Sequence, residues 1–279
     1  MNSQIKTILL LGILSAFLLL LGNVLGGQTG TLIALVLALC MNLGSYWFSD
    51  SLVLSMYHAR ETTPDDAPFL HEIVGTLARR ARIPMPRIYI VPEESPNAFA
   101  TGRDPEHAAV AVTEGLLRMM SSEQLAGVLA HEIAHIANRD ILIQTMAAVL
   151  GSAIVSIANF FQFAHLFGNR EEGSNPIAAL LLMLLAPIAA SLIQMAISRS
   201  REYLADETGA RLCRNPDYLA QALEELGRAS GQIPLQTGNP STEHMFIVKP
   251  AFAVSDSVNN LFSTHPPLTE RIQRLRQMR

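Results

Sequence analysis

Charged residues are unevenly distributed along the chain. Three runs contain no Asp, Glu, Lys or Arg: residues 7–49, 141–169 and 173–198. A helix needs about 20 apolar residues to cross a bilayer core, so the first run is long enough for two spans with a break at Gly26, Gly27 and Gly30. We predict these spans at residues 5–25 and 31–48.

The two later runs predict a second pair of spans, at residues 141–163 and 176–197. A cleaved secretory signal is the alternative for the first span, but the apolar core of a signal usually has only about 7–15 residues. A buried hairpin of a soluble core stays open for the later pair, because Gln144, Asn159, Pro187 and Gln194 interrupt it. The expected organisation is a hairpin (1–48), a polar block (49–140), a second hairpin (141–197) and a second polar block (198–279).

Basic residues near the ends of the spans predict the orientation, since short cytoplasmic flanks carry the excess of Lys and Arg. The loop at residues 22–30 has none, whereas the opposite side has Lys6, Arg60, Arg139, Arg199, Arg201, Arg211 and Arg214. Both termini and both polar blocks are therefore predicted to face the cytoplasm, in a multi-pass protein of the plasma (inner) membrane.

The polar blocks show their own periodicities. Apolar positions at helical spacing predict a helix over residues 68–81. Stretches rich in β-branched and aromatic residues predict strands at 87–91, 97–101 and 109–113, in a small antiparallel sheet. One helix is predicted to run from the Ser121 region to residue 141. Further helices are expected at 200–212, 218–228 and 267–279, with a loop at 231–242.

The composition narrows the class of protein. Charged residues make up 16% of the chain, against about 25% in soluble proteins, and the mean hydropathy is +0.27. The net charge of −4 and the lack of a long basic run argue against a nucleic-acid partner. Two cysteines, Cys40 and Cys213, cannot form a disulfide framework. These values favour a mainly α-helical integral membrane protein in contact with the lipid bilayer.

Candidate chemistry lies at residues 131–135, which read His-Glu-Ile-Ala-His. On a helix, this spacing puts His131 and His135 on one face, where they can bind one Zn²⁺, and Glu132 can act as general base toward a water on the metal. Such a motif arises by chance in some chains, so it stands as a hypothesis. The uncharged residues around it fit a buried helix.

A catalytic zinc site usually has three protein ligands. Glu202 and Asp206 share a helix face at i, i+4, so Glu202 is the predicted third ligand and Asp206 the predicted hydrogen-bond acceptor that orients His131. Glu207 is a competing ligand on another face. An exposed acidic face that pairs with neighbouring arginines is the alternative without a metal.

The motifs HEIAHIANRD, SREYLADETGA, NAFATG and THPPLTERI, in this order among apolar spans, resemble the HtpX-type membrane zinc metalloproteases, gluzincins related to the CAAX prenyl proteases. The resemblance implies a zincin-like cytoplasmic domain with one Zn²⁺ per chain on His131, His135 and Glu202, and Glu132 as catalytic base. It implies an endopeptidase in the stress response that cleaves misfolded membrane proteins.

The resemblance also suggests further site residues. It implies that a substrate strand pairs with an exposed edge formed by Asn97, Ala98, Phe99, Ala100 and Thr101. It places His265 and Arg271 near the zinc, where either could stabilise an oxyanion. Two alternatives remain: a zinc-binding scaffold or transporter without activity, and a CAAX-type prenyl-peptide protease. The natural substrates and the oligomeric state do not follow from the sequence.

Overall fold

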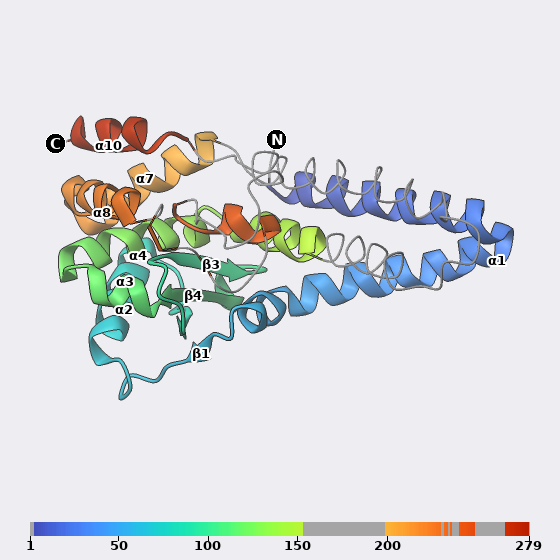
Figure 1. The fold of residues 1–279 in the computed structure, drawn as a ribbon, viewed down its shortest axis with the longest axis horizontal. Helices are drawn as coiled ribbons and strands as arrows, with labels where there is room; N and C mark the ends of the chain where they lie inside the picture. The colour runs from blue at the N-terminus through green and yellow to red at the C-terminus, as the bar shows by residue number, and fades with distance from the viewer. Residues whose placement is uncertain are drawn as a thin grey trace.

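The computed structural model describes residues 3–152, 199–229, 232–233, 235, 240–248 and 266–278. A long helical hairpin, α1, extends away from a domain of helices packed on a four-stranded sheet (Figure 1). Residues 153–163 of the predicted third span, all of the predicted fourth span, and His265 lie outside the described residues.

Helix α1 (Ser3–Met56) folds back on itself at the predicted break. Gly26 and Gly27 have non-helical backbone angles, and Gly27 has a φ of +56°, which glycine adopts at little cost. Gly30 lies within the helix. The two arms touch, because the Asn42 amide donates a hydrogen bond of 2.9 Å to Ser15 Oγ. The glycines therefore form the turn of a helical hairpin.

The second arm, Gly26–Met56, is the one helix among the described residues that is long and apolar enough to cross a membrane. It continues eight residues past the predicted end at residue 48. Eight of its large apolar side chains are each more than half exposed: Leu32, Ile33, Val36, Leu37, Leu39, Leu43, Trp47 and Phe48. The segments Thr7–Leu20 and Ile141–Ser152 form shorter apolar helices. Of the four predicted spans, the structure thus supports one clearly.

The sheet has the strand order β1-β2-β4-β3. Its strands are β1 (Arg60–Glu61), β2 (Arg87–Val91), β3 (Ala98–Gly102) and β4 (Ala108–Thr113). β2 and β4 are parallel, whereas β1 and β3 pair antiparallel with their neighbours. The prediction of an antiparallel sheet was therefore wrong: β3 lies on the far side of β4, which leaves β2 and β4 as direct, parallel neighbours.

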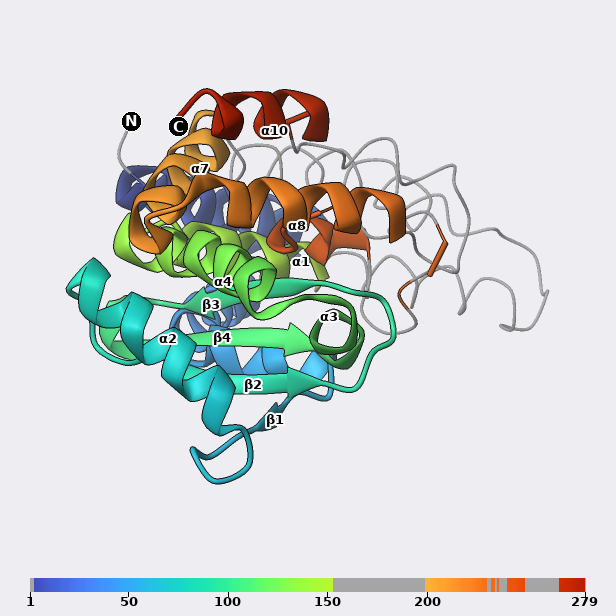
Figure 2. The same ribbon diagram turned by 90° about the vertical axis from the view of Figure 1, so that its left-hand side faces the viewer.

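Both faces of the sheet are covered, so every residue of β4 is buried. On one face, Val110 and Val112 pack in a core with residues of α2 (Pro68–Ala81) and α4 (Ser122–Ala137). On the other face, Ala109 and Ala111 pack with the end of α1, including Tyr57. Figure 2 shows α2 and α4 on one side of the sheet and α1 on the other. The sheet joins the hairpin to the helical layer.

Helix α4 has a well-defined start and end. It follows α3 (Glu114–Met119), and Ser121 and Gln124 form a capping box at its N-terminus. It ends at Ala137, followed by Arg139 at a φ of +59°, before a new helix begins at Ile141. The prediction of one continuous helix to residue 141 was wrong, because the chain turns sharply at residues 138–140.

Two further helices, α7 (Arg199–Cys213) and α8 (Pro216–Ala229), pack on α4, and α10 (Leu268–Arg276) packs on α8 and α7. Glycines allow two of these contacts. A Cβ at Gly127 would lie 2.5 Å from the backbone nitrogen of Leu219 on α8, and one at Gly209 of α7 would lie 3.0 Å from that of His131. The close approach of α7 brings its side chains beside the histidines of α4.

Candidate metal centre

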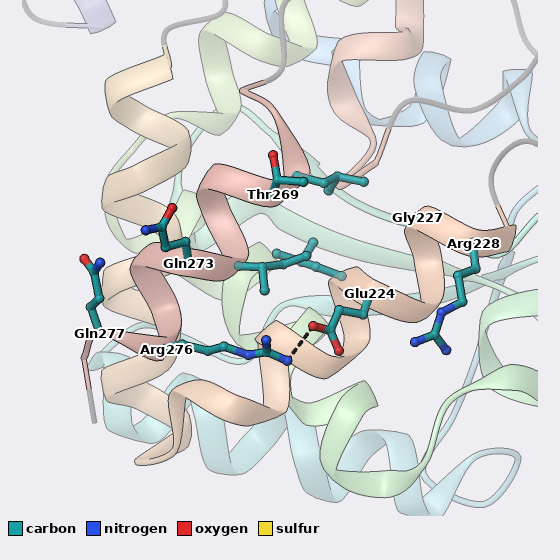
Figure 3. Close-up of a pocket in the computed structure, with 10 residues that line it drawn as sticks. Glu224, Gly227, Arg228, Thr269, Gln273, Arg276 and Gln277 are labelled. Atoms are coloured by element: carbon teal, nitrogen blue, oxygen red, sulfur yellow. Dashed lines mark hydrogen bonds and ion pairs between the residues drawn. The ribbon is translucent and has the colours of Figure 1, made fainter.

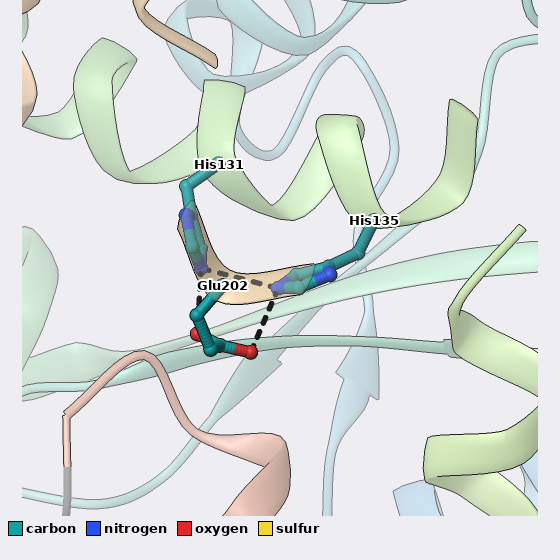
Figure 4. Close-up of side chains that lie close together, drawn as sticks. All are labelled: His131, His135 and Glu202. Atoms are coloured by element: carbon teal, nitrogen blue, oxygen red, sulfur yellow. Dashed lines mark hydrogen bonds and ion pairs between the residues drawn. The ribbon is translucent and has the colours of Figure 1, made fainter. Parts of the chain in front are cut away.

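Three buried donor groups converge between α4 and α7. His131 and His135 project from α4 one turn apart, and Glu202 faces them from α7 (Figure 4). The two histidine Nε2 atoms are 3.1 Å apart. Each lies 3.6 Å from a carboxylate oxygen of Glu202. The exposed fraction of each of these residues is at most 4%.

The spacing of these donor atoms fits a tetrahedral metal ion. Zinc bonds to nitrogen and oxygen are about 2.0–2.2 Å long, so two donors at tetrahedral positions are roughly 3.3–3.6 Å apart. The two Nε2 atoms are 3.1 Å apart, and each lies 3.6 Å from one oxygen of Glu202, Oε2 for His131 and Oε1 for His135, which is close to this range. One ligand atom from each residue lies within 4.8 Å of the others. Two imidazoles and a carboxylate are also ligands that zinc prefers. The residues therefore fit a metal with one position left for water.

Glu132 lies in the same buried region and is 2% exposed. Burial raises the pKa of its carboxyl, while the nearby His131 and His135 and a backbone hydrogen bond with Ala100 act to lower it. A carboxyl group with a raised pKa is a better proton acceptor than an ordinary surface glutamate at neutral pH. Its environment thus suits proton transfer.

A chain of buried polar contacts continues from His131. Its Nδ1 lies 2.9 Å from Asp206 Oδ1, so the predicted neighbours do meet. Burial acts to lower the pKa of His131, but hydrogen bonds with Asp206 and Glu202 outweigh it and raise that pKa to about 9. Burial also acts to raise the pKa of Asp206, but the charge of Arg271 and the hydrogen bonds with Arg271 and His131 together outweigh it and lower that pKa.

Arg271 of α10 ends this chain of contacts. Its Nε and one terminal nitrogen donate hydrogen bonds of 2.8 and 2.7 Å to the two oxygens of Asp206. Its other terminal nitrogen donates to the carbonyl oxygen of Ile247 at 2.8 Å. The side chain is fully buried. Arg271 also lies 4.0 Å from Glu202, near the zinc-site residues as predicted, and its three hydrogen bonds support a role in holding Asp206.

The predicted substrate strand is an edge strand, but it is not exposed. All residues from Asn97 to Thr101 are buried. The Ile247 N–H donates to the Ala98 carbonyl at 3.3 Å, and the Asn97 amide donates to the Val248 carbonyl at 2.9 Å. Residues 242–248, which we term the covering segment, therefore lie along β3. The expectation of a free edge was wrong in this conformation.

The covering segment is itself held in place. Its first four residues belong to the short helix η2 (Pro240–Met245). Phe246 stacks with Tyr57 and Phe99 at centroid distances of 5.3 and 5.5 Å. His244 is buried, with Nε2 3.0 Å from the Gln144 carbonyl oxygen. Contacts with α1, β3 and the helix after α4 thus fix this segment.

Asp140 was not among the site residues predicted from the sequence. In the structure Asp140 is buried, and its Oδ2 lies 3.5 Å from Nδ1 of His135. Arg201 Nη1 lies 3.8 Å from its other oxygen. The available signal was its position: an acid that directly follows the histidine helix and directly precedes an uncharged run. Glu207, the competing ligand, pairs with Arg211 on the surface of α7.

A groove in the described part of the structure lies apart from these donor residues. This groove, of 710 Å³, lies between α8 and α10 (Figure 3). Its walls include Leu223, Leu268 and Ile272, and an ion pair between Arg276 and Glu224 crosses it. None of its lining residues contributes to the histidine and glutamate cluster. The residues that could bind a metal therefore lie at the α4–α7 contact and not in this groove.

Comparison with known proteins shows to which family the chain belongs. Residues 64–279, which contain all the donors, match the model of peptidase family M48. The chain belongs to peptidase family M48. This M48 chain is 51% identical over 284 residues to a protease HtpX homolog of Syntrophobacter fumaroxidans, covering 100% of both chains. It is 56% identical to the protease HtpX homolog of Pyrococcus furiosus, covering 98% of this chain and 95% of that one.

These relatives identify the M48 chain as an HtpX-type protease. Its fold also resembles the crystal structure of S. mikatae Ste24p, with a TM-score of 0.54 and 20% identity. That match covers 98% of this chain, and the chain spans 65% of the length of the Ste24p chain. The structural likeness supports the fold alone. The resemblance seen in the sequence motifs is confirmed at the level of the family.

Proposed function

We propose that this M48 protease is a zinc-dependent endopeptidase that cleaves misfolded or damaged membrane proteins on the cytoplasmic side of the membrane. The observation that carries the proposal is the convergence of His131, His135 and Glu202, with Glu132 buried beside them. His131, His135 and Glu202 would hold the ion. A bound zinc ion would supply a Lewis acid that activates water and polarises the peptide carbonyl.

The residues of the chain account for the remaining steps. Glu132 accepts the proton of the attacking water and delivers it to the leaving amine, as its raised pKa allows. Asp206 accepts from Nδ1 of His131 and keeps Nε2 directed toward the ion. Arg271 fixes Asp206 by two hydrogen bonds. Arg271 is thereby assigned a positioning role, and His265 stays a candidate from the sequence alone.

An extended substrate would bind along β3, as the sequence suggests. Backbone hydrogen bonds to an edge strand give affinity for peptides with little regard to side chains. Since the covering segment now bonds to Ala98, a substrate must displace Ile247 to pair there. We therefore assign Asn97–Thr101 as the substrate strand in an opened form of the site.

The membrane location supports the class of substrate. Helix Gly26–Met56 presents large apolar side chains to its surroundings and packs at its end on the sheet, whose other face packs against α4. A protease held this way reaches loops and unfolded segments of neighbouring membrane proteins. The donors lie outside this helix, which disfavours a transporter, because transport needs polar ligands within the spans. The described residues offer no observation in favour of a prenyl-peptide substrate.

The proposal is tested with purified full-length protein in detergent. Glu132→Gln keeps the size of the side chain but removes the base, so it should bind zinc normally and cleave casein about 10²–10⁴-fold more slowly. Glu202→Gln should lose both bound zinc and cleavage, because a ligand is missing. Zinc content by atomic absorption and initial rates of cleavage are the two measurements.

Glu207→Gln is the matched control, since Glu207 lies on the same helix but pairs with Arg211 at the surface. It should retain zinc and activity. Loss of zinc in Glu207→Gln, but not in Glu202→Gln, would show that the ligand was misassigned. Undiminished cleavage by Glu132→Gln would rule out the mechanism.

A further inference from the structure

The two histidines of the site are supported from different directions. Nδ1 of His131 faces Asp206 of α7, whereas Nδ1 of His135 faces Asp140, just beyond the end of α4. A histidine that binds a metal almost always presents its other ring nitrogen to an acceptor, which sets the tautomer and the ring orientation. We propose that Asp140 is a positioning residue for His135, and that Arg201 holds the Asp140 carboxylate in place.

The backbone at the end of α4 places Asp140 at the level of His135. The Asp140 N–H donates to the His135 carbonyl at 2.9 Å, and the Arg139 N–H donates to the Ile136 carbonyl at 3.1 Å. This is the hydrogen-bond pattern of a Schellman motif, with Arg139 in the left-handed position that glycine usually occupies. The turn thereby returns Asp140 toward the ring of His135.

Arg201 connects this turn to the helix of the third ligand. Its Nη1 lies 3.8 Å from Asp140 Oδ1, while His135 faces Oδ2, so the two oxygens have different neighbours. The Arg201 side chain is 14% exposed and that of Asp140 is 4% exposed. A charged pair this well covered from water is held more firmly than one at the surface. Because Arg201 directly precedes Glu202, the contact ties the end of α4 to α7.

Each histidine is thus supported by a pair of an arginine and an aspartate, which we term a relay. Arg271 and Asp206 support His131, and Arg201 and Asp140 support His135. The first relay joins α10 to α7 and α4, and the second joins α7 to the end of α4. The Nδ1 distance of 3.5 Å in the second relay is at the outer limit of a hydrogen bond.

The inference rests on the proposed zinc site, so the test measures zinc affinity by chelator competition together with the visible spectrum of the Co²⁺-substituted protein. Asp140→Asn should weaken zinc binding about 10–100-fold, as removal of such a partner does elsewhere, and should shift the Co²⁺ bands. Arg201→Met should have a smaller effect in the same direction. Arg199→Met, an exposed position on the same helix, is the matched control.

A double variant separates positioning from general damage. If Arg201 acts through Asp140, the variant Asp140→Asn/Arg201→Met should bind zinc no more weakly than Asp140→Asn, because the two residues serve one contact. Metal-free samples should unfold at similar temperatures. If Asp140→Asn does not fold, Arg201→Met and its control carry the test.

Zinc affinity of Asp140→Asn within twofold of the wild type, with an unchanged Co²⁺ spectrum, would overturn the inference. If the wild type binds zinc and Glu202→Gln does not, that result leaves the proposed function standing. A wild-type protein that fails to bind zinc overturns both.

Discussion

At the scale of single residues, Arg271 is the side chain whose environment limits its role most clearly. It is fully buried, and Asp206 and the Ile247 carbonyl take up its hydrogen-bond donors. Removing it would leave the Asp206 carboxylate buried without its countercharge. Breaking such a buried pair from one side costs about 3–5 kcal/mol.

We therefore expect Arg271→Met to lower the free energy of unfolding by about 3–5 kcal/mol and to weaken zinc binding about 10–100-fold through His131. Urea unfolding and chelator competition measure the two effects. Arg276→Met on the same helix removes only a surface ion pair with Glu224 and should cost at most about 1 kcal/mol. A variant with unchanged stability and zinc affinity but a lower kcat would instead indicate direct contact of Arg271 with the substrate.

At the scale of elements, Gly127 and Gly209 determine how closely α8 and α7 approach α4. A Cβ on Gly127 would meet the backbone of Leu219, which cannot rotate away, whereas a Cβ on Gly75 of α2 would meet only ordinary contacts at 3.5 Å or more. The distance between α4 and its neighbours thus depends on the missing side chain. Because α4 carries both histidines, this spacing also sets the geometry of the site.

Gly127→Ala should lower the free energy of unfolding by about 1–3 kcal/mol, the usual cost of overpacking. Gly75→Ala is the matched control and should be neutral or stabilising by up to about 1 kcal/mol, because alanine favours the helix. Denaturant unfolding of the purified variants measures both values. Equal stability of the two variants would show that the α4–α8 contact adjusts freely.

Some elements of the fold could be predicted from the sequence, and others could not. The helix Pro68–Ala81 and the strand Arg87–Val91 were predicted with their observed bounds, because periodicity and prolines are local signals. The spacing of His131 and His135 likewise fixes their common helix face. The parallel pairing of β2 and β4 was missed, since strand order depends on contacts between residues far apart in the chain.

The other differences between the predicted and the observed site depend on tertiary contacts. The contact of Arg271 with Asp206 joins residues 65 positions apart, and no local pattern specifies it. The end of α4 at Ala137 was missed because arginine, and not glycine, takes the left-handed position there. The covering segment on β3 was missed for the same reason as the strand order. Motifs thus identified donors, while their supports came only from the fold.

At the scale of the whole molecule, the hairpin predicts a sidedness that can be measured. Glu106 on the short helix η1 (Pro105–His107) and Gln28 at the bend of α1 are both exposed, and the proposed orientation puts the bend on the other side of the membrane from the domain that contains η1. In a variant with Cys40 and Cys213 replaced by serine, Glu106→Cys should react with an impermeant maleimide only in inverted vesicles. Gln28→Cys should react only in intact cells or spheroplasts. Labelling of both from the same side would contradict the proposed orientation.

The wide separation of the site residues along the chain affects when the protein can first act. His131 and Arg271 are 140 positions apart, so at about 5–20 residues per second the ribosome needs roughly 7–28 seconds to travel between them. During that time the nascent chain presents its histidine helix without the carboxylate of Glu202 and then without the arginine that steadies Asp206. Under the proposed mechanism, the emerging chain therefore has no complete site until Arg271 has been synthesised.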